Sequence, residues 1–327
     1  MTIIFILILV VVSSYIGTFL VRRFAIKKSI IDIPNQRSSH TKPTPRGGGL
    51  VIVVIWYVII IWFFITEKLT NELFYAFLSG SLLAIVSLLD DIFSLSAKIR
   101  LIIQVFSAGM AVFFISTIHT VDLGFYIINS SFLVIPFVFI GLIWFVNLFN
   151  FLDGIDGYAA SQAIFISLAF FILTGDFLLL YLIASIIGFL IWNWQPAKIF
   201  MGDIGSTVLG FTLGVLTIYY SQKYKISIFT LLIPSALFWF DATYTLFRRW
   251  RNKEKLSEAH KKHAYQRIVQ SGFSHQKTVI SAILVNFFLL SLTFISYKCP
   301  KISMLIFIIT LVCLYFLNKL IDKRKSF

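Results

Sequence analysis

Long apolar runs, separated by short polar stretches, repeat along almost the whole chain. A helix needs roughly 20 apolar residues to cross a bilayer, and eleven runs near or somewhat below that length can be distinguished. They lie near residues 2–21, 48–65, 73–89, 101–118, 132–147, 159–173, 177–192, 207–220, 226–247, 278–297 and 304–320. The pattern predicts an all-α, polytopic integral membrane protein with about eleven transmembrane helices, in which residues 1–327 form one domain.

Composition agrees with this class, because 59% of the residues are hydrophobic and 13% are charged, which excludes an ordinary soluble domain. The cations are also unevenly placed. Of the 28 Lys and Arg residues, 23 fall in one alternate set of loops: 22–47, 90–100, 148–158, 193–206, 248–277 and 318–327. The positive-inside rule makes this set cytoplasmic, with the N-terminus outside. Topology and anionic lipid then account for the net charge of +14, so no nucleic-acid partner is expected.

The most polar break between two apolar runs is NLFNFLDGIDGYAASQ, residues 147–162. Its oxygen-bearing side chains recur every three residues, at Asn147, Asn150, Asp153 and Asp156. On a helix this spacing places all four on one face, where they would form a single polar stripe. The alternative is a polar helix end followed by a turn.

Two other inner loops combine charge with an unusual position. Asp90 and Asp91 end the third run, where a helix C-terminus disfavours carboxylates, so cation binding explains them better than stability does. Arg100 follows within reach of a phosphate. Arg46 precedes a glycine triplet at the start of the second run and is suited to phosphate, although a positive-inside anchor would look the same.

Two later loops carry further candidates. In NWQPAKIFMGDIGS, Asp203 is suited to a metal and Phe200 to stacking on a base, although a turn with an interfacial aromatic would look similar. The long loop 248–277 contains HKKHAYQR, in which His260, His263 and Arg267 would share one face of a helix and could hold a phosphate or sugar. A basic amphipathic surface helix is the alternative. Asp241 lies inside the ninth run.

These candidates share one side, because every one of these acids and histidines except Asp241 lies in the loop set defined by Lys and Arg alone. Carboxylate and amide oxygens suit Mg²⁺, and cations near glycines suit phosphates. We therefore expect an active site at the cytoplasmic edge, acting on a phosphorylated donor and on a lipid.

Five segments resemble, in order and spacing, motifs of the polyprenyl-phosphate N-acetylhexosamine-1-phosphate transferases (glycosyltransferase family 4). They are DIPNQRSSHTKPTPRGGG, LLDDIFSLSAKIR, NLFNFLDGIDGYAASQ, NWQPAKIFMGDIGS and HKKHAYQR, and they span almost the whole chain. The last is similar to the O-antigen- and common-antigen-initiating members. The peptidoglycan enzyme of the family instead carries a run of histidines in this loop.

The resemblance implies transfer of HexNAc-1-phosphate from a UDP-N-acetylhexosamine to undecaprenyl phosphate. The products would be undecaprenyl-diphosphate-HexNAc and UMP, on the inner face of a bacterial plasma membrane. This reaction would initiate O-antigen or a similar cell-surface polysaccharide. Mg²⁺, or Mn²⁺ in its place, is the expected cofactor, and a homodimer is one assembly to consider.

The same resemblance assigns roles to residues of this chain. Asp203 and Asn150 would hold the metal. Asp90, Asp91, Asp153 and Asp156 would be catalytic, the latter two helping to shape the uridine and diphosphate site. The remaining substrate-binding candidates are Arg46, Arg100, Asn147, Asn193, Phe200, His260, His263 and Arg267.

Two chemical routes stay open at this point. The lipid phosphate, with a second pKa near 6, can attack the donor directly. Alternatively, Asp90 or Asp91 forms an aspartyl-phosphate first. A different function, a multi-span lipid or sugar transporter or flippase, would place acids near the bilayer midplane in two repeats. The acids here lie at an edge.

Overall fold

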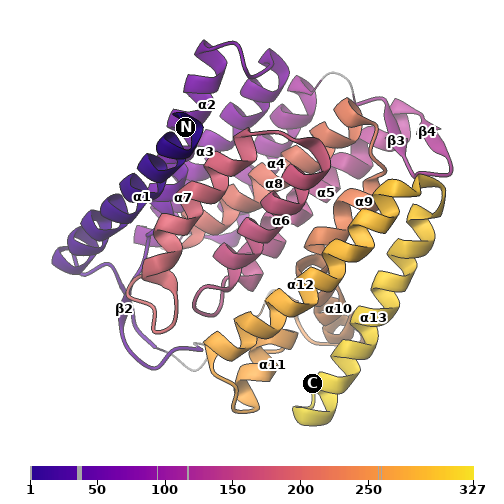
Figure 1. The fold of residues 1–327 in the computed structure, drawn as a ribbon. Helices are drawn as coiled ribbons and strands as arrows, with labels where there is room; N and C mark the ends of the chain where they lie inside the picture. Colours follow the sequence, from indigo (N-terminus) through magenta and orange to yellow (C-terminus); the bar gives the residue numbers. More distant parts are fainter. Residues whose placement is uncertain (1, 35–38, 94, 116–117, 257, 259) are drawn as a thin grey trace.

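Helices dominate the computed structural model, which describes residues 2–34, 39–93, 95–115, 118–256, 258 and 260–327 (Figure 1). This confirms the predicted all-α fold. The α-helices are α1 (Thr2–Lys27), α2 (Gly49–Ile65), α3 (Asn71–Phe93), α4 (Ala97–Phe114), α5 (Ser131–Leu152), α6 (Tyr158–Thr174), α7 (Leu178–Asn193), α8 (Asp203–Tyr224), α9 (Ile228–Leu232), α10 (Ala236–Arg251), α11 (Ala264–Gln270), α12 (His275–Lys298) and α13 (Ser303–Arg324).

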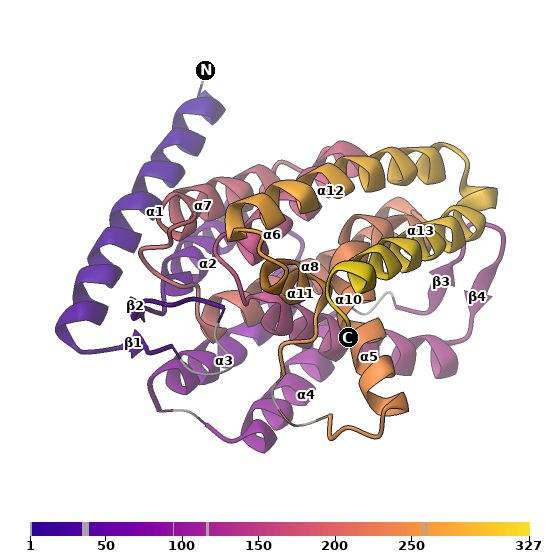
Figure 2. The same ribbon diagram turned by 90° about the horizontal axis from the view of Figure 1, so that it is seen from below.

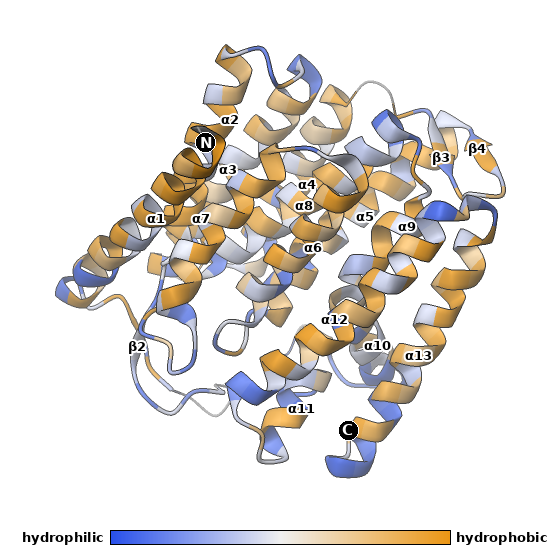
Figure 3. Cartoon of the chain, viewed as in Figure 1, coloured by the Kyte–Doolittle hydropathy of each residue, from blue (hydrophilic) through white to orange (hydrophobic). Residues whose placement is uncertain are grey.

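The predicted apolar runs correspond to these helices, whose bodies are apolar and whose ends are polar (Figure 3). In the described chain, eight helical stretches are long and apolar enough to cross a membrane, α9 to α10 being one of them. The apolar helices α2, α6 and α7 have 17, 17 and 16 residues. The protein is therefore membrane-embedded, although three of the eleven predicted spans are short for a full crossing.

The ninth predicted run, 226–247, is not one helix. A 3₁₀ turn, η1 (Ile233–Ser235), separates α9 from α10 at Pro234, because proline lacks the N–H that would continue the helix. The Pro234 carbonyl instead accepts a hydrogen bond from the Gln162 side chain at 3.2 Å. Asn286 in turn donates to Gln162 at 2.8 Å, so two neighbouring helices satisfy the break.

Two short antiparallel ladders were not expected from the apolar pattern. β1 (Ile31–Asp32) pairs with β2 (Thr44–Pro45) in the first long loop. β3 (Thr120–Asp122) pairs with β4 (Ile127–Asn129) at the opposite end of the molecule (Figure 1). The helix of the fourth predicted run, 101–118, ends before this hairpin, because α4 stops at Phe114. A second 3₁₀ turn, η2 (Pro300–Ile302), precedes α13.

Helix α8 is the centre of the fold, packed against α2, α3, α5 and α6. All of its apolar stretch is buried inside the protein, against 11% of that of α1, which packs on α7 and leans away from the other helices (Figure 2). The prediction placed Asp203 in the loop before the eighth run. In the structure it is instead the first residue of α8. The first residue of the most buried helix is therefore a carboxylate at the same end of the molecule as β1, β2 and α11.

Candidate active site

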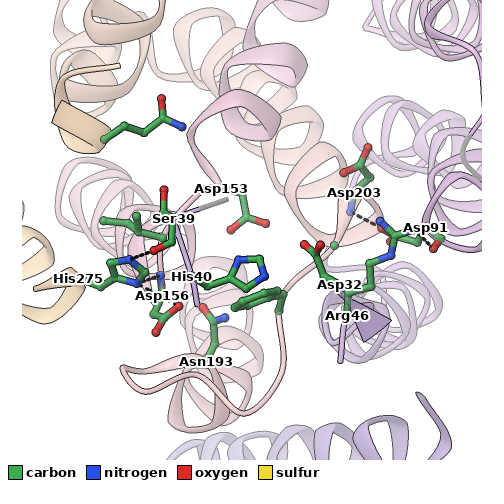
Figure 4. Close-up of a pocket in the computed structure, with 15 residues that line it drawn as sticks. Asp32, Ser39, His40, Arg46, Asp91, Asp153, Asp156, Asn193, Asp203 and His275 are labelled. Atoms are coloured by element: carbon green, nitrogen blue, oxygen red, sulfur yellow. Dashed lines mark hydrogen bonds and ion pairs between the residues drawn. The ribbon is translucent and has the colours of Figure 1, made fainter. Parts of the chain in front are cut away.

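Two cavities meet at Asp203. The first, of about 450 Å³, lies among the loop before α2, the end of α3, the α5–α6 turn, the α7–α8 loop and the starts of α11 and α12 (Figure 4). Seven predicted site residues line it: Arg46, Asp91, Asp153, Asp156, Asn193, Phe200 and Asp203. With Gln266 of the last motif, the fold thus brings all five sequence motifs to one cavity.

The second cavity, of about 320 Å³, lies among α3, α4, α5 and α8. Arg100, Asn147 and Asn150 line it together with Asp203, and the rest of its wall is largely apolar. Asn147 donates to Gln104 at 2.8 Å, and the Asn150 amide lies beside the Asp203 carboxylate. Asp203 is therefore accessible from both cavities.

The adjacent acids Asp90 and Asp91 are both committed to contacts within the protein. Asp91 accepts the backbone N–H groups of Asp203 at 3.0 Å and of Ile204 at 3.2 Å, so its carboxylate caps the N-terminus of α8. Gly202, at φ +79°, permits this approach, since a Cβ there would lie 2.6 Å from an Asp91 oxygen. Asp91 thereby sets the position of Asp203.

Asp90 lines neither cavity. It accepts the Leu95 N–H at 2.5 Å and the Arg100 guanidinium at 3.1 Å. The same Arg100 nitrogen, Nη1, lies 3.1 Å from Asp203. Arg100 thus bridges two carboxylates, and its Nη2 and Nε make no hydrogen bond to any described residue. On the other side, Arg46 donates to the Asp91 carbonyl.

The polar stripe predicted for residues 147–156 is only half helical. Helix α5 ends at Leu152, and Gly157 at φ +74° is the N-cap of α6. Asn147 and Asn150 share the helix, whereas Asp153 and Asp156 belong to the turn and diverge (Figure 4). Asp156 accepts the Ala197 N–H at 3.1 Å and lies 3.2 Å from the His275 ring. The alternative prediction, a polar helix end followed by a turn, is therefore correct for Asp153 and Asp156.

Asp153 is the carboxylate left over. It points into the first cavity (Figure 4), and no hydrogen bond or ion pair joins its carboxylate to any described residue. Its recessed position, and then the nearby carboxylates of Asp203, Asp91 and Asp156, raise the pKa of Asp153 to about 8. In the absence of a cation, Asp153 is therefore mostly protonated at neutral pH.

Two predicted residues at the α7–α8 loop differ in their contacts, because Asn193 is hydrogen-bonded within the protein and Phe200 faces the cavity. Asn193 accepts the Gly157 N–H at 3.0 Å and donates to the Ile199 carbonyl at 3.0 Å, so its amide ties this loop to the α5–α6 turn. The Phe200 ring remains at the cavity wall, with the His40 ring centroid 4.8 Å away, edge to face. A planar ring entering this cavity would meet an aromatic face.

The expectation that His260, His263 and Arg267 share one helix face is wrong, because α11 begins only at Ala264. His263 is the residue before it, and His260 lies in irregular chain. Burial, and then the neighbouring His263, lower the pKa of His260 to about 4, so it is neutral at pH 7. None of the three residues lines either cavity.

Arg267 is buried and bonded within the protein. Its guanidinium donates to Asp322, to Asn318 at 3.2 Å and to the Lys325 carbonyl at 3.2 Å. This geometry fixes α11 against α13 and leaves little of the side chain for a substrate.

Sequence reasoning did not select five further residues whose polar side chains line the first cavity: Asp32, Ser39, His40, Gln266 and His275. Asp32, Ser39 and His40 belong to the first motif and Gln266 to the last, so closer attention to those motifs would have found them. His275, the first residue of α12, lies outside every motif. Its Nε2 lies 3.1 Å from the Ser39 carbonyl, and its position follows from tertiary packing alone.

The donor set fits a hard divalent cation. The Asp203 carboxylate lies where the two cavities meet, the Asn150 side chain lies beside it, and several carboxylates face one another there. Among the described residues, no three His, Cys, Asp or Glu side chains group closely enough to form a complete protein cage. Mg²⁺ characteristically takes one or two carboxylates and completes its shell with water and substrate phosphates, so this sparse set suits it.

Comparison with known proteins agrees with the site. Residues 73–221 match the family described as glycosyl transferase family 4. The chain is 31% identical over 317 residues to a probable undecaprenyl-phosphate N-acetylglucosaminyl 1-phosphate transferase of Bacillus subtilis, over 91% of this chain and 86% of that protein.

Two other relatives have related names. An undecaprenyl-phosphate alpha-N-acetylglucosaminyl 1-phosphate transferase of Thermotoga maritima is 34% identical over 213 residues, which is 64% of each chain. A decaprenyl-phosphate N-acetylglucosaminephosphotransferase of Mycolicibacterium smegmatis is 27% identical over 310 residues, covering 82% of this chain and 76% of that protein.

Fold, site and relatives define a membrane-embedded phospho-sugar transferase. The chain belongs to the polyprenyl-phosphate N-acetylhexosamine-1-phosphate transferase family, which confirms the resemblance seen in its motifs. The transporter or flippase reading is therefore set aside.

Proposed function

We propose that this protein transfers HexNAc-1-phosphate from a UDP-N-acetylhexosamine to undecaprenyl phosphate, giving undecaprenyl-diphosphate-HexNAc and UMP. The observation that carries the proposal is the junction of two unlike cavities at Asp203, one polar and one opening among apolar helices. A transferase with a soluble and a lipid substrate needs such a junction, because the two phosphates must meet.

The first cavity suits the nucleotide donor. Its Phe200 ring offers a stacking face for a base, and Arg46 offers a cation for the diphosphate. The relatives' names make N-acetylglucosamine the first sugar to test.

The second cavity suits the phosphate end of the lipid. The Arg100 guanidinium, whose Nη2 and Nε bond no described residue, and the Asn147 amide are polar groups among α3, α4 and α5. An isoprenoid chain can leave along the apolar sides of these helices without exposing itself to water.

The reaction we infer is a direct displacement. An oxygen of the lipid phosphate attacks the β-phosphorus of the donor, a new P–O–P linkage forms, and the bond from that phosphorus to the bridging oxygen breaks, so UMP leaves with the bridging oxygen. Asp90 and Asp91 are poorly placed as nucleophiles, because N–H groups already occupy their oxygens. Arg46 and Arg100 balance the charge that accumulates on the phosphates.

Asp153 is the carboxylate available for a proton. A lipid phosphate arriving as a monoanion has a pKa near 6, below the pKa of about 8 of the Asp153 carboxyl. At neutral pH that pKa keeps Asp153 protonated, so Asp153 would take the proton only where a cation bound nearby favours its ionised form, and the phosphate would then be the stronger nucleophile. Mg²⁺, or Mn²⁺ in its place, held by Asp203 and Asn150, would neutralise phosphate charge when bound.

We place this site at the cytoplasmic face of a bacterial plasma membrane, and we assign the product to O-antigen or a similar surface polysaccharide. The support for the face is the location of 23 of 28 cations in one loop set. A cysteine in place of Lys255 should be labelled only from the cytoplasm, and one in place of Asn71 only from outside. Labelling in the reverse sense would exclude a cytosolic donor.

The test of function is a donor panel. Purified protein with undecaprenyl phosphate and Mg²⁺ should release UMP and form a lipid-linked sugar diphosphate with at least one UDP-HexNAc. A folded protein that acts on no UDP-sugar in the panel would contradict the proposal.

A further inference from the structure

Helix α11, which carries the end of the HAYQR segment, packs beneath the turn that holds Asp153. Its Tyr265 is 2% exposed, and the Tyr265 hydroxyl donates to the Phe151 carbonyl at 3.2 Å. The last carbonyls of a helix have no partner within that helix. Tyr265 therefore satisfies the end of α5 two residues before Asp153.

The absence of a side chain at Gly154 makes this contact possible. A Cβ built at Gly154 would lie 2.0 Å from the Tyr265 hydroxyl oxygen and 3.0 Å from its ring carbon Cζ. Gly154 does not have a positive φ. Space for Tyr265, rather than backbone freedom, is thus what the structure requires of a glycine here.

Tyr265 also contacts the far side of the same turn. Its ring centroid lies 5.1 Å from that of Tyr158, the first residue of α6. One buried side chain therefore touches both ends of the segment from Phe151 to Tyr158, and Asp153 lies between them.

Helix α11 is itself held from two sides. The Asp241 carboxylate in α10 accepts the Ala264 N–H, at 2.8 and 3.0 Å from its two oxygens. Arg267 binds Asp322 and Asn318 in α13. This explains the intramembrane Asp241, which anchors the first N–H of α11. Tyr265 is consequently presented from a fixed support.

We propose that Tyr265 is a positioning residue for Asp153: its hydroxyl ends α5 at Leu152 and holds the following turn so that the Asp153 carboxylate points into the donor cavity. HAYQR then acts on the reaction through the α5–α6 turn as well as through Gln266, which lines the first cavity, whereas His263 and Arg267 line neither cavity. This inference rests on the proposed function, in which Asp153 takes part in transfer.

Tyr265→Phe is the first test, because it removes the hydroxyl and keeps the ring. We expect kcat to fall about tenfold with the donor KM nearly unchanged, since a misplaced group costs rate more than binding. Tyr158→Phe is the matched control, because its hydroxyl does not bond Phe151, and it should keep kcat within about twofold. A Tyr265→Phe enzyme with wild-type kcat would overturn the proposal.

The second test uses the steric fit. Gly154→Ala should lower kcat about a hundredfold, since its methyl group collides with the Tyr265 hydroxyl and displaces the turn. Adding Tyr265→Phe should raise activity again, to the level of Tyr265→Phe alone, and should raise Tm as well. Independent, multiplying losses would refute the contact. Recovery of Tm without recovery of kcat would show that Tyr265 only stabilises the fold.

The two proposals fail separately. If the wild-type protein acted on no donor, the proposed function would fail, yet the reciprocal effect on Tm would still test the Gly154–Tyr265 fit. If the wild type were active and Tyr265→Phe were not impaired, only the positioning role would be lost.

Discussion

Asp90 and Asp91 carry the same side chain as Asp153, but the surroundings of the carboxylates differ. N–H groups of the protein occupy both members of the pair: Asp91 caps α8, and Asp90 accepts from Leu95 and Arg100. Asp153 has no such partner among the described residues and opens into the donor cavity. A carboxylate that orders a helix end and one that opens into the cavity thus line the same site. The comparison teaches that proximity to the cavity does not by itself define a catalytic role.

Substitution of Asp203, which lines both cavities, should have the largest effect on activity. Asp203→Asn removes a charge from the proposed metal site without removing volume, so transfer should fall by about a thousandfold or more. UMP release measured across a Mg²⁺ titration checks this, with Asp122→Asn in the β3–β4 hairpin as the control that keeps activity. Near-normal turnover at ordinary Mg²⁺ concentrations would exclude the metal role.

A single-turnover experiment sharpens the distinction between the acids. Since both carboxylates of the pair are occupied, enzyme given UDP-HexNAc without lipid should release no stoichiometric burst of UMP. Rapid quench with radiolabelled donor measures this. A burst that disappears in Asp90→Asn or Asp91→Asn, with phosphosugar bound to the protein, would establish the covalent route instead.

Stability should separate Asp91 from Asp153. Asp91→Asn weakens the cap on α8 and should cost about 1 kcal/mol, lowering Tm by a few degrees together with activity. Asp153→Asn should lower kcat without lowering Tm. Thermal unfolding in detergent, followed beside UMP release, compares the two variants; an equal loss of Tm in both would contradict the assignment.

The pH dependence of stability gives a smaller effect with a definite sign. The pKa of Asp153 is raised from 3.8 to about 8, so the folded state holds a proton that the unfolded chain releases. The free energy of unfolding that this bound proton contributes is fully present below pH 3.8 and is lost as pH rises towards 8. With chelator present, the Tm of Asp153→Asn minus that of wild type should therefore grow across this range and level off above it. A constant difference would argue against a raised pKa.

The smallest effect is expected at His260, which lines neither cavity and is neutral at pH 7. His260→Ala should change kcat/KM less than about threefold, whereas Arg46→Ala in the donor cavity should lower it at least tenfold. Steady-state kinetics with the preferred donor decides. A large loss at His260 alone would place this residue at the substrate, beside Gln266 and His275 of the same loop.

The sequence by itself determined the membrane class, the helix positions and the segments that build the site. Apolar length decides whether a helix can span a bilayer, and short polar motifs stand out against an oily background. The ends of α5 and α11, the break at Pro234 and the β1–β2 and β3–β4 ladders escaped this reasoning. The end of α5 and the break at Pro234 depend on partners distant in sequence, Tyr265 and Gln162, whereas β3 and β4 pair with near neighbours in the chain.

Only the tertiary structure decided which acids are free. Asp91 and Asp153 are indistinguishable as residue types, and each lies at or near a helix end. The Asp91 carboxylate is bonded because the N-terminus of α8 lies against it. Asp203, which donates its N–H there, is 112 residues further along the chain. Asp153 opens into the cavity because the α5–α6 turn, whose Phe151 carbonyl accepts from Tyr265 114 residues away, brings no N–H group of the described residues to its carboxylate. Hydrogen-bond partners across such separations are fixed by packing, and local sequence carries no record of them.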